Sequence, residues 1–481
     1  FFKLFFTDEL ITRIVEQTNN YARRKIAQKS LSKRSTWHTW VDTTVEEFSA
    51  FIGVILNMGM ITVSNIQEYW SQQYSAKIPF FSNTFRRERF LQIFWMLHLH
   101  ENDPNNQTLK ARTHKVSHYL DYLDKQFKEH LIPSRELTVD ESIVGFKGKI
   151  NFLTHKPNKP TQWGIRIYVM ADANTGYVHS ILPYYGSVTS EDLVRPDLPE
   201  STRIVLHFCH KLLEINPASK GYHFYTNRYY TSLPLAEELL KLNVYLTGTI
   251  QIDDIFIPDC IKNPAFAEDK IYACRSGNLM LLAWKDKRVV TALTSWDISK
   301  MQPIKRKESN LQVVNKPTVV VNYDKYIKGI HRTDMVSASY CFLRKSLKWW
   351  RKLFFWGLEM SSINAYLLYK ISQRSQNEKP MTHLKFVREL VEGLTKNFRQ
   401  GSRASGKPSL LDTEERLNGN LHILRQNNGK KKDCTVCSNR KVQGGRRETR
   451  YICATCTLKP GLHIGDCFER YHTLKLYKTD R

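Results

Sequence analysis

The spacing of apolar residues changes twice along the chain. In residues 9–24, 45–60 and 85–98, apolar side chains recur every three or four positions, which is the spacing of amphipathic helices. From Leu137 onward the pattern becomes short apolar runs bounded by Gly, Pro and Asn, which is typical of strands. Helical spacing returns over residues 334–372. The pattern therefore predicts a helical entry region, a sheet and a second helical region.

The middle of the chain is predicted to alternate strands with helices. A helix expected over residues 234–242 separates apolar runs on either side, and such alternation favours an α/β core. The strands expected in this core span residues 164–171, 176–183, 223–225 and 244–250. Shorter strands at 271–273, 279–284 and 289–293 indicate a β-rich insertion. A basic linker is expected over residues 305–316.

The charge of the chain narrows the class of partner. Its 481 residues include 72 Lys and Arg against 46 Asp and Glu, a formal net charge of +26 that is spread along the sequence. The natural partner of so much positive charge is a polyanion, with DNA or RNA ahead of an anionic membrane surface. With 41% hydrophobic residues, the chain is expected to be globular and to form about three domains.

The sequence predicts neither a transmembrane segment nor a secretory signal. The longest apolar run, residues 50–63, includes Asn57 and is shorter than the roughly 20 residues that a spanning helix needs. The sequence starts at Phe1 without Met, as expected of a chain with a trimmed N-terminus. Four of the nine cysteines are scattered, as reduced core cysteines are. We therefore expect the protein in the cytosol or the nucleus.

Two closely spaced cysteine pairs near the C-terminus predict metal binding. Cys434-x2-Cys437 and Cys453-x2-Cys456 each place two thiolates on a tight turn, where they can bind one tetrahedral zinc ion. A redox-active pair is the alternative, but this Arg- and Lys-rich segment lacks a thioredoxin-like βαβ pattern. Further residues raise the candidate ligands to eight, enough for two structural Zn²⁺ ions, although His422 alone in a polar linker is more often simply solvated. The eight are His422, Cys434, Cys437, Cys453, Cys456, His463, Cys467 and His472.

Basic residues accompany both the cysteine cluster and the last predicted helix. Such residues suit contacts with DNA phosphates. Two alternatives stay open: a merely soluble surface on the cysteine-rich module, and a packed helix whose long basic side chains reach solvent. The candidate DNA-binding residues are Arg344, Lys345, Lys348, Arg351, Lys352, Lys430, Lys431, Lys432, Arg440, Lys441, Arg446 and Arg447.

An acidic residue ends an apolar strand at Asp140, where it could project toward a metal ion. Taken alone, an Asp in this position is more often a turn or capping residue. Its sequence context resembles the piggyBac transposase family, and the resemblance runs nearly end to end. The blocks that carry it are FFTDEL (5–10), LTVDES (137–142), YYTS (229–232), KGI (328–330) and CFERYH (467–472).

The resemblance implies an α/β fold with a ribonuclease H-like core and an inserted β-rich domain. Helical regions for dimerisation and DNA binding would flank this core, and a cross-braced zinc module would end the chain. The expected domains are a helical dimerisation and DNA-binding region at 1–130, the core at 131–253 and 317–341, the β-rich insertion at 254–316, a helical DNA-binding region and linker at 342–420, and the zinc-binding domain at 421–478.

The resemblance also locates a degenerate catalytic site. Members of the family cut and join DNA with three aspartates that hold two Mg²⁺ ions, and a fourth acid lies nearby. By motif, these positions fall on Asp140, Asn227 and His331, and Asp334 matches the fourth. Mg²⁺ prefers anionic oxygen, so a neutral amide and an imidazole are poor replacements. Because two-metal phosphoryl transfer relies on both ions, we predict that the ancestral Mg²⁺ and DNA cleavage are lost.

Three functional hypotheses follow from the sequence. The leading one is a domesticated, catalytically inert protein in the nucleus that binds double-stranded DNA as a homodimer, with transposon terminal repeats as candidate targets. The second is an active cut-and-paste transposase that uses Asp140 and Asp334 with altered metal ligation. The third is a chromatin adaptor whose zinc module binds a protein tail.

Overall fold

The structure, a computed structural model, divides into two compact units, Phe1–Arg399 and Gln400–Arg481. Among the residues that it describes, no helix is both long and apolar enough to cross a membrane. The described residues are 1–28, 30–32, 35–101, 108–157, 161–217, 221–252, 257–264, 266, 271–286, 288–305, 313–329, 346, 348–398, 416–427, 429–440, 442, 444–474 and 477–478.

Helices from both ends of the first unit pack into one helical layer. The layer consists of α1 (Asp8–Ala27), α2 (Val45–Met60), α3 (Pro79–Thr84), α4 (Arg87–Met96), α5 (Leu109–Thr113), α6 (Ser117–His130), α13 (Trp349–Ser375) and α14 (His383–Thr395). Thr7, Thr44 and Thr382 begin three of these helices. Each threonine hydroxyl accepts a hydrogen bond from a first-turn N–H that the helix leaves unpaired. The helix predicted over residues 45–60 is confirmed at both ends.

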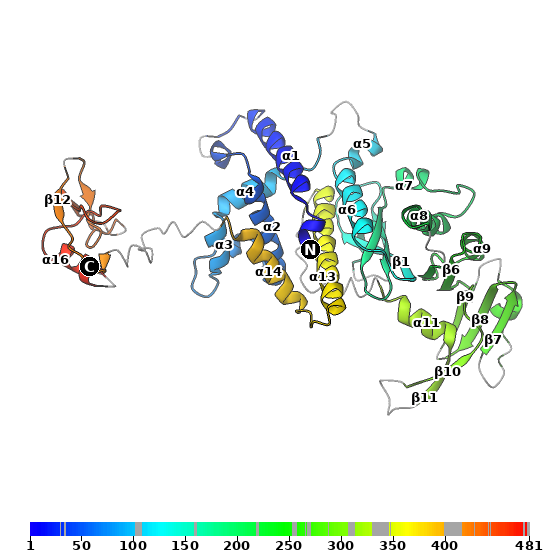
Figure 1. The fold of residues 1–481 in the computed structure, drawn as a ribbon. Coiled ribbons are helices and arrows are strands. Elements are labelled where there is room, and N and C mark those ends of the chain that lie inside the picture. The colour runs from blue at the N-terminus through cyan, green and yellow to red at the C-terminus, as the bar shows by residue number, and fades with distance from the viewer. Residues whose placement is uncertain are drawn as a thin grey trace. The chain divides into compact units, whose positions relative to one another are not determined.

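Helix α2 lies at the centre of this layer, and most of its side chains are buried. It packs against α1 and α14, and Figure 1 shows the yellow and orange α13 and α14 among the blue N-terminal helices. Gly53 permits the close approach of α14, because a Cβ atom at this position would lie 2.8 Å from Thr395 Cγ2. Helices from the expected regions 1–130 and 342–420 therefore share one hydrophobic core.

A nine-stranded mixed sheet forms the rest of the first unit's framework. Its strands are β1 (Glu136–Gly145), β2 (Thr154–His155), β3 (Trp163–Asp172), β4 (Val178–Pro183), β5 (His223–Thr226), β6 (Tyr245–Thr249), β7 (Ile271–Ser276), β8 (Leu279–Lys285) and β9 (Val289–Thr294). The order is β2-β3-β1-β5-β6-β9-β8-β7, and β4 pairs with β3. β1 is antiparallel to β3 and parallel to β5, which in turn is parallel to β6.

Helices cover both faces of the central strands. Alternate residues of a strand point to opposite faces, so Ile167 and Val169 of β3 join the core of the helical layer, whereas Tyr168 and Met170 join a second core. Side chains of α8 and α9 complete the second core. The helices that follow or cross the sheet are α7 (Ser187–Glu191), α8 (Glu200–Ile215), α9 (Leu233–Lys241), α10 (Asp259–Lys262) and α11 (Thr318–Tyr326).

The β-rich segment contains two features that the sequence did not predict. β9 pairs antiparallel with β6, so β7, β8 and β9 extend the central sheet. Residues 305–316, predicted to be a basic linker, instead begin and end in strands: β10 (Met301–Lys305) pairs antiparallel with β11 (Val313–Pro317). The prediction of a linker was wrong at both ends. Backbone pairing tolerates polar side chains, so the pattern of apolar residues does not reveal strands of this kind.

Two buried polar side chains fix strand β4 to the helical layer. Asn364 of α13 accepts a hydrogen bond from the Val178 N–H at 3.0 Å and donates one to the Val178 carbonyl at 2.8 Å. Asp124 of α6 accepts hydrogen bonds from the Ser180 hydroxyl and the Ile181 N–H, both at 2.8 Å. β4 pairs with β3. The two side chains therefore satisfy backbone groups on its other edge, which burial would leave unpaired.

The second unit is a small fold with a small core. Its elements are β12 (Leu424–Gln426), β13 (Lys432–Asp433), β14 (Glu448–Thr449), β15 (Tyr451–Cys453) and α16 (Asp466–Thr473). β12 pairs with β15 and β13 with β14, both antiparallel. The buried side chains of this unit include cysteines as well as Val436, Leu462 and Tyr471. Burial of so few apolar groups is too little to stabilise a domain of this size.

We expect Asn364→Ala to lower the free energy of unfolding of the first unit by about 2–4 kcal/mol, because two buried backbone groups of Val178 would lose their partners. Denaturant titration followed by tryptophan fluorescence measures the change. Asn20→Ala, at an exposed position of α1, is the control and should alter the value by less than about 0.5 kcal/mol. Equal losses in the two variants would contradict the role given to Asn364.

Candidate functional site

Asp140 and Asn227 lie side by side where the parallel pairing of β1 with β5 ends. Strand β1 itself continues to Gly145, so the expectation that Asp140 ends its strand was wrong; pairing with β3 extends β1 beyond it. Val139 of β1 is in register with Thr226 of β5, so the residue that follows each one lies at the same edge of the sheet. Thr226 is also in register with Gly248 of β6. In open α/β sheets, ligands bind outside the carboxyl ends of parallel strands. The structure therefore brings two of the predicted site residues together at the edge where chemistry is expected.

A hydrogen bond joins the two side chains. Asn227 Nδ2 donates to Asp140 Oδ1 at 3.1 Å, and the backbone N–H of Glu141 donates to the same oxygen at 2.8 Å. The other end of the amide, Asn227 Oδ1, accepts from the Tyr229 N–H at 2.9 Å. The amide thus presents a donor to Asp140. Its oxygen, the atom that could bind a cation, is instead hydrogen-bonded to the backbone of the turn that Asn227 begins. Asp140 is 6% exposed, so these bonds replace water around a buried carboxylate.

A second buried carboxylate lies next to Asp140 in sequence, and the prediction did not include it. Glu141 accepts a hydrogen bond from the Tyr230 hydroxyl at 2.9 Å, and its carboxylate lies 3.5 Å from Lys156 Nζ. Burial raises the pKa of Tyr230 well above its usual value, and the charges of Glu141 and Asp140 raise it further. Because adjacent strand residues point to opposite faces, Glu141 is directed away from Asp140. The acidic pair in the sequence was the signal that could have identified it.

Helix α11 returns the chain to strand β1 close to Asp140. The Thr138 hydroxyl donates to the Ile327 carbonyl at 3.5 Å. Gly329 packs so closely on β1 that a Cβ atom there would lie 2.6 Å from Thr138 Cγ2. Thr138 and Asp140 share a face of β1 because they are two residues apart. The segment that precedes the predicted third site residue therefore reaches the same face as Asp140.

The eight predicted zinc ligands gather into two sets of four in the second unit. One set is Cys434, Cys437, His463 and Cys467; the other is His422, Cys453, Cys456 and His472. Within each set the ligand atoms all lie within 4.8 Å of one another. His422, the least certain ligand in the sequence, has its Nδ1 atom 3.7 Å from Cys453 Sγ and 3.5 Å from Cys456 Sγ. The predicted clustering of all eight residues is confirmed.

The spacing within each set fits a tetrahedral zinc ion. Zinc bonds of about 2.3 Å to sulfur and about 2.0–2.1 Å to nitrogen put neighbouring ligand atoms roughly 3.5 Å apart. Cys437 Sγ lies 3.4 Å from His463 Nδ1, and Cys456 Sγ lies 3.5 Å from His472 Nε2. The two sets also interleave along the chain. Bound zinc would thus cross-link distant parts of the unit and supply the folding energy that its small core lacks.

The electrostatics of the first set favour a bound cation. Burial would raise the pKa of the Cys434 thiol, but backbone N–H groups of Cys437, His463 and Val436 outweigh burial and lower this pKa to about 7. Burial and the neighbouring sulfurs of Cys434 and Cys437 raise the pKa of Cys467 to about 12. A divalent cation would remove the repulsion that opposes a third thiolate.

Two basic residues predicted to contact DNA are buried instead. Arg351 is 1% exposed and Lys352 is 8% exposed. Arg351 Nη2 donates to the Trp95 carbonyl at 2.6 Å near the C-terminal end of α4, and its guanidinium lies over the rings of Trp95 and Trp350. A cation at a helix C-terminus offsets the partial negative charge of the last carbonyls. Burial lowers the pKa of Arg351 to about 10. The expectation of phosphate contacts is therefore wrong for both residues.

Lys348, in contrast, lines a basic pocket of about 460 Å³ between α1, α13 and the residues after α4. Burial, together with Arg351, Lys115 and Lys25, lowers the pKa of Lys348 to about 8. The described lining residues include no acid, although Arg24 forms an ion pair with Glu101 outside the pocket. The lining residues are Tyr21, Arg24, Lys25, His98, Lys115, Lys348, Trp349 and Trp350.

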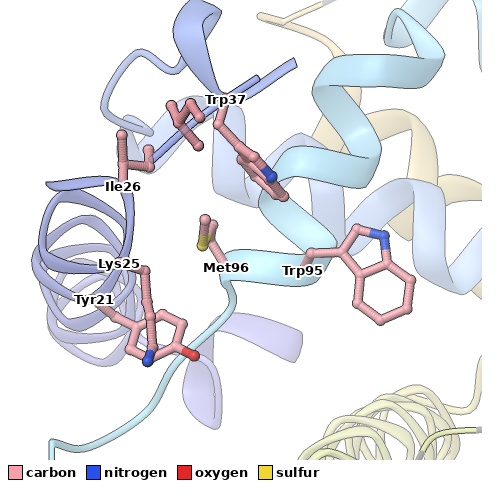
Figure 2. A pocket seen from close by; sticks show the side chains of 7 residues that line it. Tyr21, Lys25, Ile26, Trp37, Trp95 and Met96 are labelled. Carbon is pink, nitrogen blue, oxygen red and sulfur yellow. The ribbon is translucent and has the colours of Figure 1, made fainter. Parts of the chain in front are cut away.

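A smaller pocket of about 200 Å³ shares Tyr21 and Lys25 with the basic pocket. Figure 2 shows Trp37 and Met96 facing the side chains of α1, with Trp95 on the far side of Met96. Trp95 is 53% exposed. Exposed aromatic rings beside cations suit nucleic-acid bases and phosphates. No spacing in the sequence predicts these pockets, because packing of separate helices assembles them.

The remaining predicted site residues divide into two groups. Lys430, Lys431, Lys432, Arg440, Arg446 and Arg447 are all exposed on the second unit. Asp433 forms ion pairs with Arg440 and Arg446, which lower the pKa of its carboxyl group. The predictions for the other group stay untested because those residues lie outside the described part of the chain. They are His331, Asp334, Arg344, Lys345 and Lys441.

Comparisons with known proteins identify the family. A family model described as Transposase IS4 matches residues 1–366, more than half of the chain. The chain belongs to the piggyBac transposase-like family. A second model, described as a DDE_Tnp_1-like zinc finger, matches residues 417–473 and so includes both sets of zinc ligands.

Relatives of this family align with most of the chain. Human PiggyBac transposable element-derived protein 3 is 25% identical over 484 residues, which cover 98% of this chain and 75% of the human protein. Human PiggyBac transposable element-derived protein 5 is 24% identical over 410 residues, 82% of this chain and 74% of that protein. A cryo-EM structure of a piggyBac transposase synaptic complex with hairpin DNA superposes with a TM-score of 0.71 at 25% identity, covering 84% of this chain and 82% of that chain.

Removal of one cysteine from each set is expected to abolish both zinc sites. Cys434→Ser combined with Cys453→Ser should lower bound zinc by about two ions per chain and unfold the second unit, because each site needs four ligands. Metal analysis and limited proteolysis measure the two effects. Cys260→Ser, at an exposed cysteine of the first unit, should change neither. Unchanged zinc in the double variant would refute the assignment.

Asn227→Asp is expected to make the first unit respond to divalent cations. Two carboxylates about 3 Å apart repel each other unless a cation lies between them. The variant should be less stable in chelator, and its unfolding temperature should rise by about 2–4 °C in Mn²⁺ or Mg²⁺. Asn227→Ala, which adds no charge, is the control and should show no such rise. Differential scanning calorimetry with and without metal decides between them.

Proposed function

We propose that this chain is a transposase-derived protein that binds double-stranded DNA without cleaving it. The observation that carries the proposal is the hydrogen bond from Asn227 Nδ2 to Asp140 Oδ1. An amide donor occupies the position at which a second carboxylate would be needed to hold a catalytic cation. The eight zinc ligands, by comparison, are all present and clustered. Such a protein keeps the parts used for binding and lacks those used for cutting.

The central sheet supports a ribonuclease H-like core. Antiparallel β4, β3 and β1 continue into parallel β5 and β6, and helices cover both faces. Asp140 lies at the carboxyl edge of the parallel strands, as a site residue of such a core would. In this assignment, strands β7 to β9 are the inserted β-rich segment.

Magnesium does not fit the residues at this edge. Of the three principal positions, Asp140 is the single carboxylate, because Asn227 and His331 replace the other two acids. The Asn227 oxygen is engaged with the Tyr229 N–H, and an imidazole nitrogen is a poor ligand for a hard cation. Two negative charges are therefore missing from a site that would have to hold two divalent ions. We assign no cleavage step to this site.

Binding of DNA is supported by the solved relative and by the surface of the second unit. The solved relative is a piggyBac transposase synaptic complex with hairpin DNA. The exposed side chains Lys430, Lys431 and Lys432 are not part of the ion pairs around Asp433. Lys430 and Lys431 therefore stay available for phosphates, and Lys432, whose Nζ donates to the Lys459 carbonyl at 3.0 Å, has two further N–H donors. Phosphate contacts release counterions and make affinity fall with salt. We further propose a homodimer in the nucleus that recognises transposon terminal repeats.

A mobility-shift assay with the full chain tests binding. Terminal-repeat duplex and scrambled duplex of equal composition are compared at about 50, 100 and 200 mM salt. We expect tighter binding to the repeat, and a loss of about tenfold or more when Lys430, Lys431 and Lys432 are changed to Ala together. The matched control changes three exposed lysines of the first unit to Ala; these are Lys379, Lys385 and Lys396.

The outcomes separate the functional hypotheses. Equal affinity for both duplexes would reduce the proposal to nonspecific DNA binding. Failure to bind either duplex, together with binding of histone-tail peptides, would favour a chromatin adaptor. Nicking of plasmid DNA in Mn²⁺ that disappears in Asp140→Ala would revive an active transposase.

A further inference from the structure

Three histidine side chains converge on the first unit, apart from the Asp140 edge and the two cysteine-containing sets. His100 follows α4, His114 lies in the turn after α5, and His118 lies in the first turn of α6. One ring nitrogen from each lies within 4.8 Å of those of the other two. The ring centroids are 4.9 to 6.1 Å apart. Nothing in the proposed DNA-binding function uses this cluster.

The backbone holds the three rings together. His114 begins the short turn that joins α5 to α6, His118 follows that turn, and their ring centroids are 5.1 Å apart. His100 is supplied by the segment after α4, which is tied to α1 through Thr18. The Thr18 hydroxyl donates to the His98 carbonyl at 3.3 Å and accepts from the His98 N–H at 3.2 Å. The cluster thus joins the segment after α4 to the turn between α5 and α6.

The surroundings of His100 favour its neutral form. Burial lowers the pKa of His100, and the neighbouring His118, His114 and Arg13 lower it further. Neutral imidazole is the form that binds metal ions. Asp121, three residues after His118, interacts electrostatically with that ring. Its carboxylate offsets part of the repulsion that Arg13 would exert on a cation.

We propose that His100, His114 and His118 bind a divalent transition-metal ion of the class that imidazole prefers, with zinc as the first candidate. Three nitrogens around zinc would lie about 3.3 Å apart, so binding would draw the rings inward by side-chain rotation. His118 is exposed and the other two rings are half-buried, which leaves a fourth position open to water. Such an ion would cross-link the segment after α4 to the α5–α6 turn.

The proposal is tested by comparing the zinc content of the wild-type chain with that of variants changed in the first unit. The second unit is the same in all of them, so its zinc cancels from the comparison. After equilibration with zinc and removal of the excess, the wild-type chain should hold about one ion more than His114→Ala combined with His118→Ala. His38→Ala, at an exposed histidine of the same unit, should match the wild type. Equal zinc in all three chains would overturn the proposal.

A second measurement guards against a misfolded variant. Zinc should raise the unfolding temperature of the wild-type first unit by about 2–4 °C, and His100→Ala should abolish the rise without changing the metal-free value.

Cobalt(II) added to chains whose cysteine sets already hold zinc gives a spectroscopic check. The ion should show no sulfur-to-metal charge-transfer absorption, because the site has nitrogen ligands. Such absorption, or an equal zinc response in His100→Ala, would place the ion elsewhere and reject the site.

Discussion

The parallel pairing of β1 with β5 is the constraint on which the rest of the first unit depends. It sets Val139 opposite Thr226 and therefore Asp140 beside Asn227. A slip of one residue would turn one side chain of this pair to the other face of the sheet. The same strands separate the two hydrophobic cores, since alternate residues pack against the helical layer and against α8 and α9. The contact between carboxylate and amide is thus a consequence of register in a packed sheet.

In the proposed function, this register lets a cleavage site be lost without loss of the fold. A pair of carboxylates at this edge would need a cation to offset its repulsion, whereas a carboxylate and an amide satisfy each other. Asp and Asn have nearly the same shape, so the exchange leaves the packing of β1 and β5 intact. In the proposed function, internal hydrogen bonds take the place of a bound cation at this site. Stability of the sheet and cutting of DNA are therefore separable.

The sequence predicted those features whose signals are local. Helix α2 follows from apolar spacing, and the zinc ligands follow from cysteine pairs that can share one ion whatever surrounds them. Features made by long-range packing were missed or misjudged. Arg351 resembled a surface cation because its helix mixes basic and aromatic residues, and nothing in that run shows that the end of α4 lies against it. The hairpin of β10 and β11 and the cluster around His100 depend likewise on segments far apart in sequence.

The two units differ in what stabilises them, and this difference accounts for the contrast between their sites. Burial across two large cores holds the first unit, so replacement of one carboxylate at a sheet edge costs it little. In the second unit the cysteine ligands make up much of the small core. Loss of one ligand there would remove both buried contacts and metal-derived folding energy. The second unit therefore needs its zinc ligands in order to fold, whereas an acid at the sheet edge of the first unit would serve chemistry alone. This difference accounts for the proposed contrast between a complete set of zinc ligands and an incomplete set of catalytic acids.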